Sequence, residues 1–179
     1  MVEEAPLRRT DSWLVPEGEG WFVVNAREAR WLDDGPLGVY TPFAGEARFP
    51  RIGINLAVLE PGQPSSMYHG EDEQEDFLIL AGECLLLIEE QERSLRAWDF
   101  VHCPPGTRHT FVGIGEDPCV IFMTGARSEG GTIVYPVSET ARAHGAGVDA
   151  ETPRPSEAYA PFPHWRLGRP DAWPGLPWS

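Results

Sequence analysis

The sequence predicts an all-β protein, folded as an antiparallel sandwich or barrel. Short apolar runs rich in β-forming residues recur at nearly even spacing from residue 52 onwards, and turn signals separate them. Glycine and proline together make up roughly a fifth of the 179 residues (19 and 18), which leaves little room for long helices. Apolar residues account for 41% of the chain, enough to build the core of one domain.

Residues 1–50 are expected to form an N-terminal arm with short strands that pack on the barrel. Trp13 is the expected anchor of this arm, and WFVV at 21–24 is the first run typical of a strand. Aromatic residues scattered between glycines and prolines over 25–50 indicate short strands and loops rather than a linker.

Residues 51–136 are expected to form the barrel core. The predicted strands lie within 52–60, 76–80, 83–90, 93–103, 109–114 and 119–125, and Pro-Gly, Ala-Gly and Pro-Pro-Gly turns separate several of them.

Two of these strands are apolar at every position, 77–80 and 85–88. Because side chains alternate across a strand, Phe77 and Ile79 would face the interior while Leu78 and Leu80 point outwards. Something must cover that outer face. A second copy of the chain in a homodimer is the simplest candidate, and the alternative is the N-terminal arm or the C-terminal tail.

Residues 137–179 are expected to form a short helix and an extended tail. SETARAHG at 138–145 predicts the helix, with Ser138 as N-cap and Gly145 as the stop signal. Residues 152–179 hold seven prolines and three tryptophans, which favours a tail packed against the barrel or a partner.

Charge and cysteine content narrow the classes of function. The formal net charge of −14 argues against nucleic acid and anionic membranes as partners. No apolar run reaches the length of a transmembrane helix, and the N-terminus lacks a signal-peptide pattern, so we expect a cytoplasmic protein. The three cysteines have no CxxC spacing and sit beside apolar residues, which predicts buried reduced thiols.

Two stretches concentrate side chains that can bind metals: residues 68–75 (YHGEDEQE) and residues 104–109 (PPGTRH). On an extended strand His69, Glu71, Glu73 and Glu75 would share one face, unless a turn breaks the register. Imidazole and carboxylate together suit Fe(II), Mn(II), Ni(II) or Zn(II). Taken alone, the acidic run is also compatible with a solvated loop.

The spacing of these residues resembles the two motifs of the cupins, G-x5-H-x-H-x3-4-E-x6-G and G-x5-P-x-G-x2-H-x3-N. The positions that match are His69, Glu75 and Gly82 in the first motif, and Pro104, Gly106 and His109 in the second. Glu71 stands in the place of the second histidine. The resemblance spans about residues 52–125.

The chain also departs from the motifs. Gly62 lies seven rather than six positions before His69, so the strict register would put Tyr68 and Gly70 at the histidine positions. Trp98 replaces the first glycine of the second motif, and Gly113 replaces its asparagine.

The resemblance implies a double-stranded β-helix barrel of two antiparallel sheets with one divalent transition metal ion inside, whether Zn, Fe, Mn or Ni. Its ligands would be His69, Glu75 and His109, with Glu71 as a fourth ligand or as a general base. This implies a metal-dependent small-molecule enzyme of the oxygenase or isomerase kind. Three alternatives stay open: a non-catalytic cupin that binds or senses a small ligand, a cupin that has lost its metal, and a dimer whose metal only stabilises the barrel.

Overall fold

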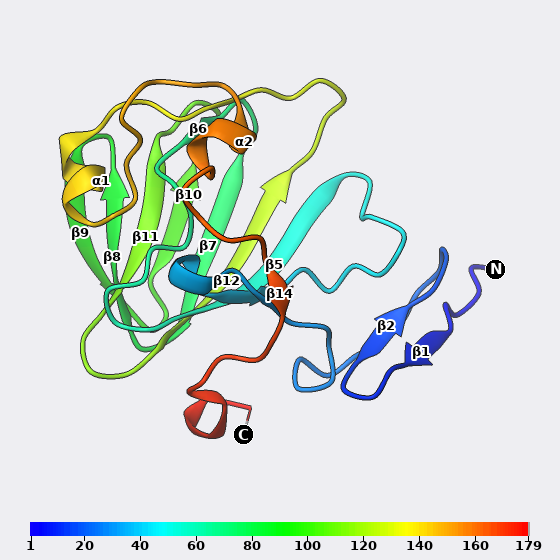
Figure 1. Ribbon diagram of the computed structural model, residues 1–179. Helices are drawn as coiled ribbons and strands as arrows, with labels where there is room; N and C mark the ends of the chain where they lie inside the picture. Colours follow the sequence, from blue (N-terminus) through cyan, green and yellow to red (C-terminus); the bar gives the residue numbers. More distant parts are fainter. Residues whose placement is uncertain (179) are drawn as a thin grey trace.

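Two antiparallel sheets face each other and enclose one apolar core (Figure 1). The computed structural model describes residues 1–178. The larger sheet has seven strands in the order β10-β7-β12-β5-β4-β3-β14, and each neighbouring pair is antiparallel. These strands are β3 (Leu32–Asp33), β4 (Val39–Thr41), β5 (Ile52–Leu59), β7 (Glu75–Ala81), β10 (Phe100–Cys103), β12 (Cys119–Ala126) and β14 (Arg166–Leu167).

Smaller sheets complete the molecule. The opposite wall of the barrel is β11 (His109–Ile114), β8 (Glu83–Ile88) and β9 (Gln91–Arg96), in that order. The remaining elements are the hairpin β1 (Leu7–Arg9) and β2 (Leu14–Pro16), the pair β6 (Gly70–Glu71) and β13 (Ile133–Val134), the helices α1 (Glu139–Ala143) and α2 (Pro155–Ala158), and the 3-10 turns η1 (Gly35–Leu37) and η2 (Trp173–Gly175). The predicted all-β barrel is confirmed.

The core between the two sheets follows from strand alternation. Phe77 and Ile79 on β7 are buried inside the barrel, as predicted, and Phe111 on β11 meets Phe77 with ring centroids 4.7 Å apart. All three cysteines are buried in this cluster and form no disulfide, which confirms the prediction of buried thiols.

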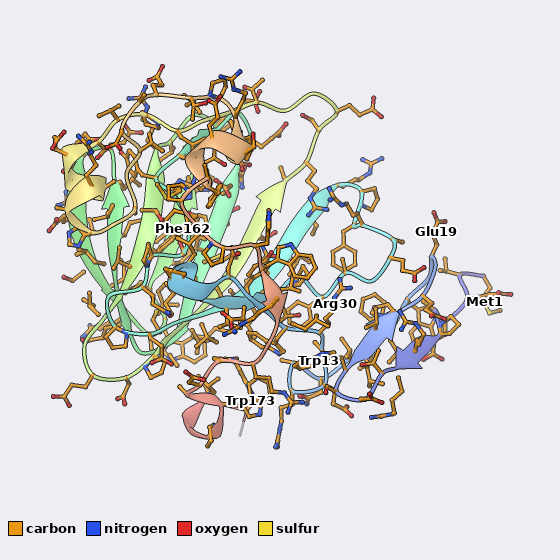
Figure 2. All side chains as sticks on the ribbon, viewed as in Figure 1. Met1, Trp13, Glu19, Arg30, Phe162 and Trp173 are labelled. Atoms are coloured by element: carbon orange, nitrogen blue, oxygen red, sulfur yellow. The ribbon has the colours of Figure 1, made fainter. Side chains whose placement is uncertain are left out.

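The chain's own arm and tail cover much of the outer face of the larger sheet. Trp13 and Trp31 from the N-terminal segment pack with Trp173 from the tail over β5, β7 and β12, where Leu80 joins the cluster (Figure 2). Trp31 is fully buried, and its indole N–H donates to the Ala26 carbonyl. The alternative raised for this face, cover by arm and tail, is therefore what the fold displays around Leu80.

A short helix covers the outer face of the three-stranded sheet. Ala141 of α1 packs with Leu87 of β8 and Val112 of β11. The predicted N-cap is confirmed, because the Ser138 hydroxyl oxygen accepts a hydrogen bond from the Ala141 N–H at 3.1 Å. Gly145 follows the helix with φ at +72°, in agreement with its predicted role as stop signal. The four-residue α2 was not predicted.

The predicted strand at 21–24 is wrong. Within it, only Trp21 makes a β-bridge, to Glu4, and the next residues have no partner strand. The run is followed at once by a turn in which Glu28 and Ala29 donate their main-chain N–H groups to the Asn25 carbonyl. A four-residue apolar run lacks a signal for whether a neighbour will pair with it.

No helix in the described part of the chain, residues 1–178, is long and apolar enough to cross a membrane.

The structure shows what two departures from the cupin motifs, at Gly113 and Trp98, mean for the backbone. Gly113 lies so close to β5's end that an added Cβ would collide with the Glu60 carbonyl, so asparagine cannot stand there in this backbone. Trp98 occupies a turn with φ at +77°, a left-handed conformation that favours the glycine of the motif. Its side chain is 74% exposed and has little packing to offset this cost.

Replacing Trp98 with glycine is expected to stabilise the fold. The left-handed conformation costs a non-glycine residue roughly 1–2 kcal/mol of folding free energy, which glycine would avoid. The greater freedom of glycine in the unfolded chain offsets about 0.4–1 kcal/mol of this gain. The net gain should be about 1 kcal/mol, or a rise in Tm of roughly 2–4 °C, measured by calorimetry. Trp98→Ala is the matched control and should gain nothing, because it keeps the strained backbone. An unchanged or lower Tm for Trp98→Gly would contradict the explanation.

Candidate metal centre

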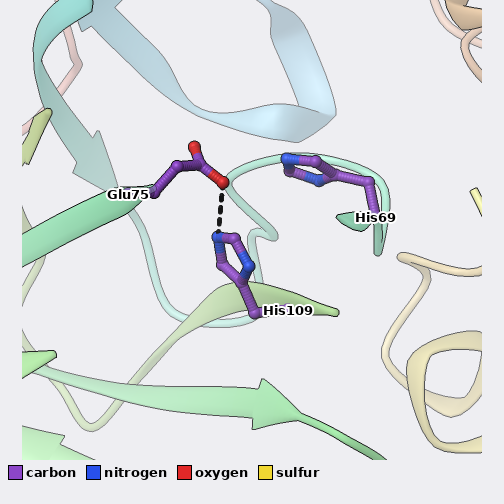
Figure 3. Close-up of side chains that lie close together, drawn as sticks. All are labelled: His69, Glu75 and His109. Atoms are coloured by element: carbon purple, nitrogen blue, oxygen red, sulfur yellow. Dashed lines mark ion pairs between the residues drawn. The ribbon is translucent and has the colours of Figure 1, made fainter. Parts of the chain in front are cut away.

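Three side chains that can bind a metal meet at one end of the barrel: His69, Glu75 and His109 (Figure 3). Glu75 is the first residue of β7 and His109 the first of β11. Because residues of equal parity share a face, both side chains point into the barrel directly above Phe77 and Phe111. The His109 ring contacts Phe77 with centroids 5.1 Å apart, so an apolar layer closes the barrel beneath the polar end.

Main-chain pairing brings the third residue to the site. The His109 N–H donates to the His69 carbonyl at 2.8 Å, and the His69 N–H donates to the His109 carbonyl at 3.2 Å. This isolated antiparallel bridge holds the two imidazole rings side by side, with centroids 5.2 Å apart.

The candidate ligand atoms lie close together. One ligand atom from each of the three residues lies within 4.8 Å of the others, and Nε2 of His109 is 3.5 Å from Oε2 of Glu75 (Figure 3). Ligand atoms about 2.1 Å from one ion are separated by about 3–4 Å, so a small closure would let all three reach it.

Hydrogen bonds fix the orientation of both rings. Nδ1–H of His69 donates to the Met67 carbonyl at 2.7 Å, and Nδ1–H of His109 donates to the Thr107 carbonyl at 3.1 Å. A carbonyl accepts only from a protonated ring nitrogen, so each neutral ring carries its proton on Nδ1 and its lone pair on Nε2. Both lone pairs are then available on the side of the carboxylates, as a metal requires.

Burial favours the neutral form of all three groups. It lowers the pKa of His69, and it lowers that of His109 to about 4, with the neighbouring His69 as a second cause. Burial also raises the pKa of Glu75 to about 8, and the charge of Glu71 adds to the effect. At neutral pH the site therefore offers two neutral imidazoles and one protonated carboxyl, whose proton a binding cation would displace to solvent. This donor set fits a divalent transition metal.

Glu71 lies beside this cluster rather than within it. Its Oε1 is 3.9 Å from Nε2 of His69, and about a third of its side chain is exposed. A turn at 72–73 separates β6 from β7, so the shared face expected for the acidic run ends there. Glu73 accepts a hydrogen bond from the Ser128 hydroxyl instead and takes no part in the site.

The structure also decides between the two registers of the first motif. Tyr68 faces away from the barrel interior and packs with Leu87 beneath α1, while its hydroxyl accepts from the Glu90 N–H. His69 is the residue that faces His109. The extra residue after Gly62 is thus absorbed before His69.

A cavity of about 490 Å³ opens next to Glu71, and sequence reasoning missed one of its walls. Gly70 to Asp72 and Gly106 line one side, and Thr132 to Val134 line the other. The ring of Tyr135, the residue after Val134, lies next to the His69 ring, with centroids 5.8 Å apart, and packs edge-on against Tyr159. Neither tyrosine carries a spacing signal, because both lie after the last strand of the motif region.

Comparison with known proteins identifies the fold. Residues 55–125 match the family model described as Cupin domain. The structure of KdgF from Halomonas sp. aligns with a TM-score of 0.51 at 21% identity, over 62% of this chain and 97% of that chain. A Cupin 2 conserved barrel domain protein from Salinispora arenicola aligns with a TM-score of 0.50 at 20% identity, over 62% and 92%. These two likenesses show the cupin fold.

A sugar phosphate isomerase of the cupin superfamily from Silicibacter pomeroyi is 30% identical, with a TM-score of 0.45 over 48% of this chain. This chain spans 56% of the length of that isomerase. Among curated proteins no match was found.

Affinity of this site for a divalent ion should depend on pH. Between about pH 6 and pH 8 the Glu75 carboxyl is largely protonated, and a bound ion must displace that proton. Affinity for Mn²⁺ should therefore rise about tenfold per pH unit and level off above pH 8, while His109 stays neutral throughout. Calorimetric titration in two buffers of different ionisation enthalpy measures the affinity and the proton released. In Glu75→Gln the slope should vanish; an equally steep slope there would rule Glu75 out as its source.

Proposed function

We propose that this protein, whose residues 55–125 match the cupin domain model, is a metal-dependent small-molecule enzyme of the oxygenase or isomerase kind. One divalent transition metal ion, Zn, Fe, Mn or Ni, is held by His69, Glu75 and His109. The observation that carries the proposal is the orientation of the two imidazoles, whose Nδ1–H groups are engaged by main-chain carbonyls so that both Nε2 atoms face the carboxylates.

Three protein ligands leave further coordination positions open, and a bound ion would supply a Lewis acid that polarises a substrate oxygen. The cavity beside Glu71 receives the substrate. Phe77 and Phe111 close the barrel on the inner side and keep bulk water from reaching the ligands from below.

Glu71 is our candidate for the catalytic residue. It stands at the junction of the cavity and the ligand cluster, because it lines the cavity and approaches His69 at 3.9 Å. From that position its carboxylate can take a proton from a substrate carbon or hydroxyl, or act as a fourth ligand. A carboxylate one-third exposed can also pass the proton on to solvent.

A non-catalytic cupin that binds or senses a small ligand is the second candidate. The cavity of about 490 Å³ is large enough for a small molecule whether or not a reaction follows. The two candidates differ in what Glu71 does, since only an enzyme needs its carboxylate as a base.

We further propose a cytoplasmic homodimer. The three buried thiols suit a reducing compartment. Leu78 lies between Phe100 and Phe122 in one cross-strand row on the outer face of the larger sheet. Phe122 joins the cluster covered by arm and tail, but Phe100 is 65% exposed. A second copy packed over this uncovered end of the row would bury it.

His109→Ala is expected to abolish metal binding while the barrel stays folded. Elemental analysis of untagged protein, purified without added metal or chelator, should find near one equivalent of ion per wild-type chain and almost none in the variant. His144→Ala is the matched control, because that histidine pairs with Glu92 and is not one of the three clustered residues. A wild-type protein that stays metal-free after reconstitution would contradict the proposal.

Glu71→Gln then separates enzyme from binding protein. As a base, Glu71 is essential for turnover but not for holding the ion, so the variant should keep most of its metal and lose activity by roughly a hundredfold or more. Full activity in the variant would remove Glu71 from the mechanism. Unchanged binding of one ligand by His109→Ala, without turnover in either protein, would favour the binding module.

Sedimentation at micromolar concentration should give a species of about twice the chain mass of 19.9 kDa. Phe100→Glu places a charge in the proposed interface and should yield a monomer. Val23→Glu is the control, since Val23 is at least as exposed as Phe100 but lies outside the row. A wild-type monomer would exclude the dimer.

A further inference from the structure

A second cavity, of about 520 Å³, lies outside the barrel between the N-terminal hairpin and the C-terminal tail. Its wall combines residues from β1, β2 and the turn between them with Arg30, and with Trp165 and Leu167 from the tail. It shares no lining residue with the cavity beside Glu71. Figure 2 shows Arg30 and Trp13 where the hairpin meets the body of the molecule.

Within residues 1–178, the side chain of Arg30 lacks acceptors for most of its N–H groups. In the part of the chain that the structure describes, its buried Nε finds no hydrogen-bond partner, and the one hydrogen bond of its side chain runs from a terminal nitrogen to the Ala44 carbonyl at the long distance of 3.5 Å. Among residues 1–178 no carboxylate forms an ion pair with it, although the chain carries twice as many acids as bases. Arg30 is partly buried, and leaving its buried Nε without an acceptor is costly, so a bound anion that accepts from it would relieve the cost.

The other charged groups in this cavity favour an anion that carries a single negative charge. Arg8 is already engaged, with its Nε 2.5 Å from Glu17 and a terminal nitrogen 3.8 Å from Glu46. Asp11 lines the same cavity and adds negative charge. One free guanidinium beside a carboxylate suits a monoanion better than a phosphate dianion, and its planar fork matches a carboxylate.

Two indoles give the cavity its apolar surface. Trp13 is almost fully buried and is held from one side by Arg169, whose guanidinium lies 4.7 Å from the ring centroid. Trp165 is 55% exposed and lines the cavity from the C-terminal tail. Such surfaces favour a flat apolar ring.

We propose that this cavity binds a small aromatic carboxylate, with the carboxylate on Arg30 and the ring against Trp165 and Trp13. The site is built jointly by the arm and the tail, so the ligand would tie the two ends of the chain together. It does not depend on the metal centre.

Benzoate is the probe, and benzamide, of the same shape without the charge, is its neutral control. The protein is first treated with chelator, because a carboxylate can also bind a metal. Titration followed by NMR of the tryptophan indole N–H groups should give saturable shifts with benzoate and none with benzamide. Arg30→Gln should weaken benzoate binding roughly tenfold or more, since a charge-assisted bond is lost. Trp165→Ala changes an exposed tail residue, keeps the fold, and should also weaken it.

His109→Ala tests whether the site is separate, and should bind benzoate like the wild type. Binding lost in His109→Ala but kept in Arg30→Gln would place the ligand in the barrel and overturn the inference. So would equal binding of benzamide, or the absence of saturable shifts in a wild-type protein that is folded by the same spectra.

Discussion

The two main-chain hydrogen bonds between His69 and His109 are the constraint on which the candidate metal centre depends. Residue 69 comes directly before the two-residue strand β6, and these two bonds tie it to the first residue of β11. The bridge places its ring beside His109, and strand alternation independently turns Glu75 and His109 inwards. Once the three side chains share one buried end, desolvation follows, and it sets their protonation. Geometry and electrostatics of the site thus have a single origin in the backbone.

Much of the fold could be predicted from periodicity and turn residues. The barrel strands from residue 52 onwards can be recognised in the sequence because turn residues bound them. Ser138 predicts the start of its helix because a hydroxyl before a helical run caps its N-terminus. The prediction of a strand at 21–24 was wrong, since apolar character alone does not show whether a neighbouring strand will pair with the run. The sequence left two candidates for the cover of the outer face, a second copy of the chain or the chain's own arm or tail. Near Leu80 the tertiary packing of Trp13, Trp31 and Trp173 shows that arm and tail provide the cover.

For the candidate site, spacing was enough to predict that His69, Glu75 and His109 lie close together, because register fixes the positions of residues on paired segments. It was not enough for Glu71 and Glu73, whose directions depend on a turn at 72–73 that breaks the expected alternation. Tyr135 and Tyr159 come from segments beyond the barrel motifs, and their approach depends on how the tail returns over the open end. Local sequence carries no record of such long-range packing.

The carbonyls that hold the two imidazoles belong to Met67 and Thr107, and they are main-chain atoms. In many metal sites that task falls to a carboxylate side chain, which a single mutation can remove. Here the identity of residues 67 and 107 is irrelevant to the ring tautomers as long as the backbone keeps its path. Side chains around the three clustered residues can therefore change without altering the ring tautomers, and new linings can evolve around an unchanged arrangement of the candidate ligands.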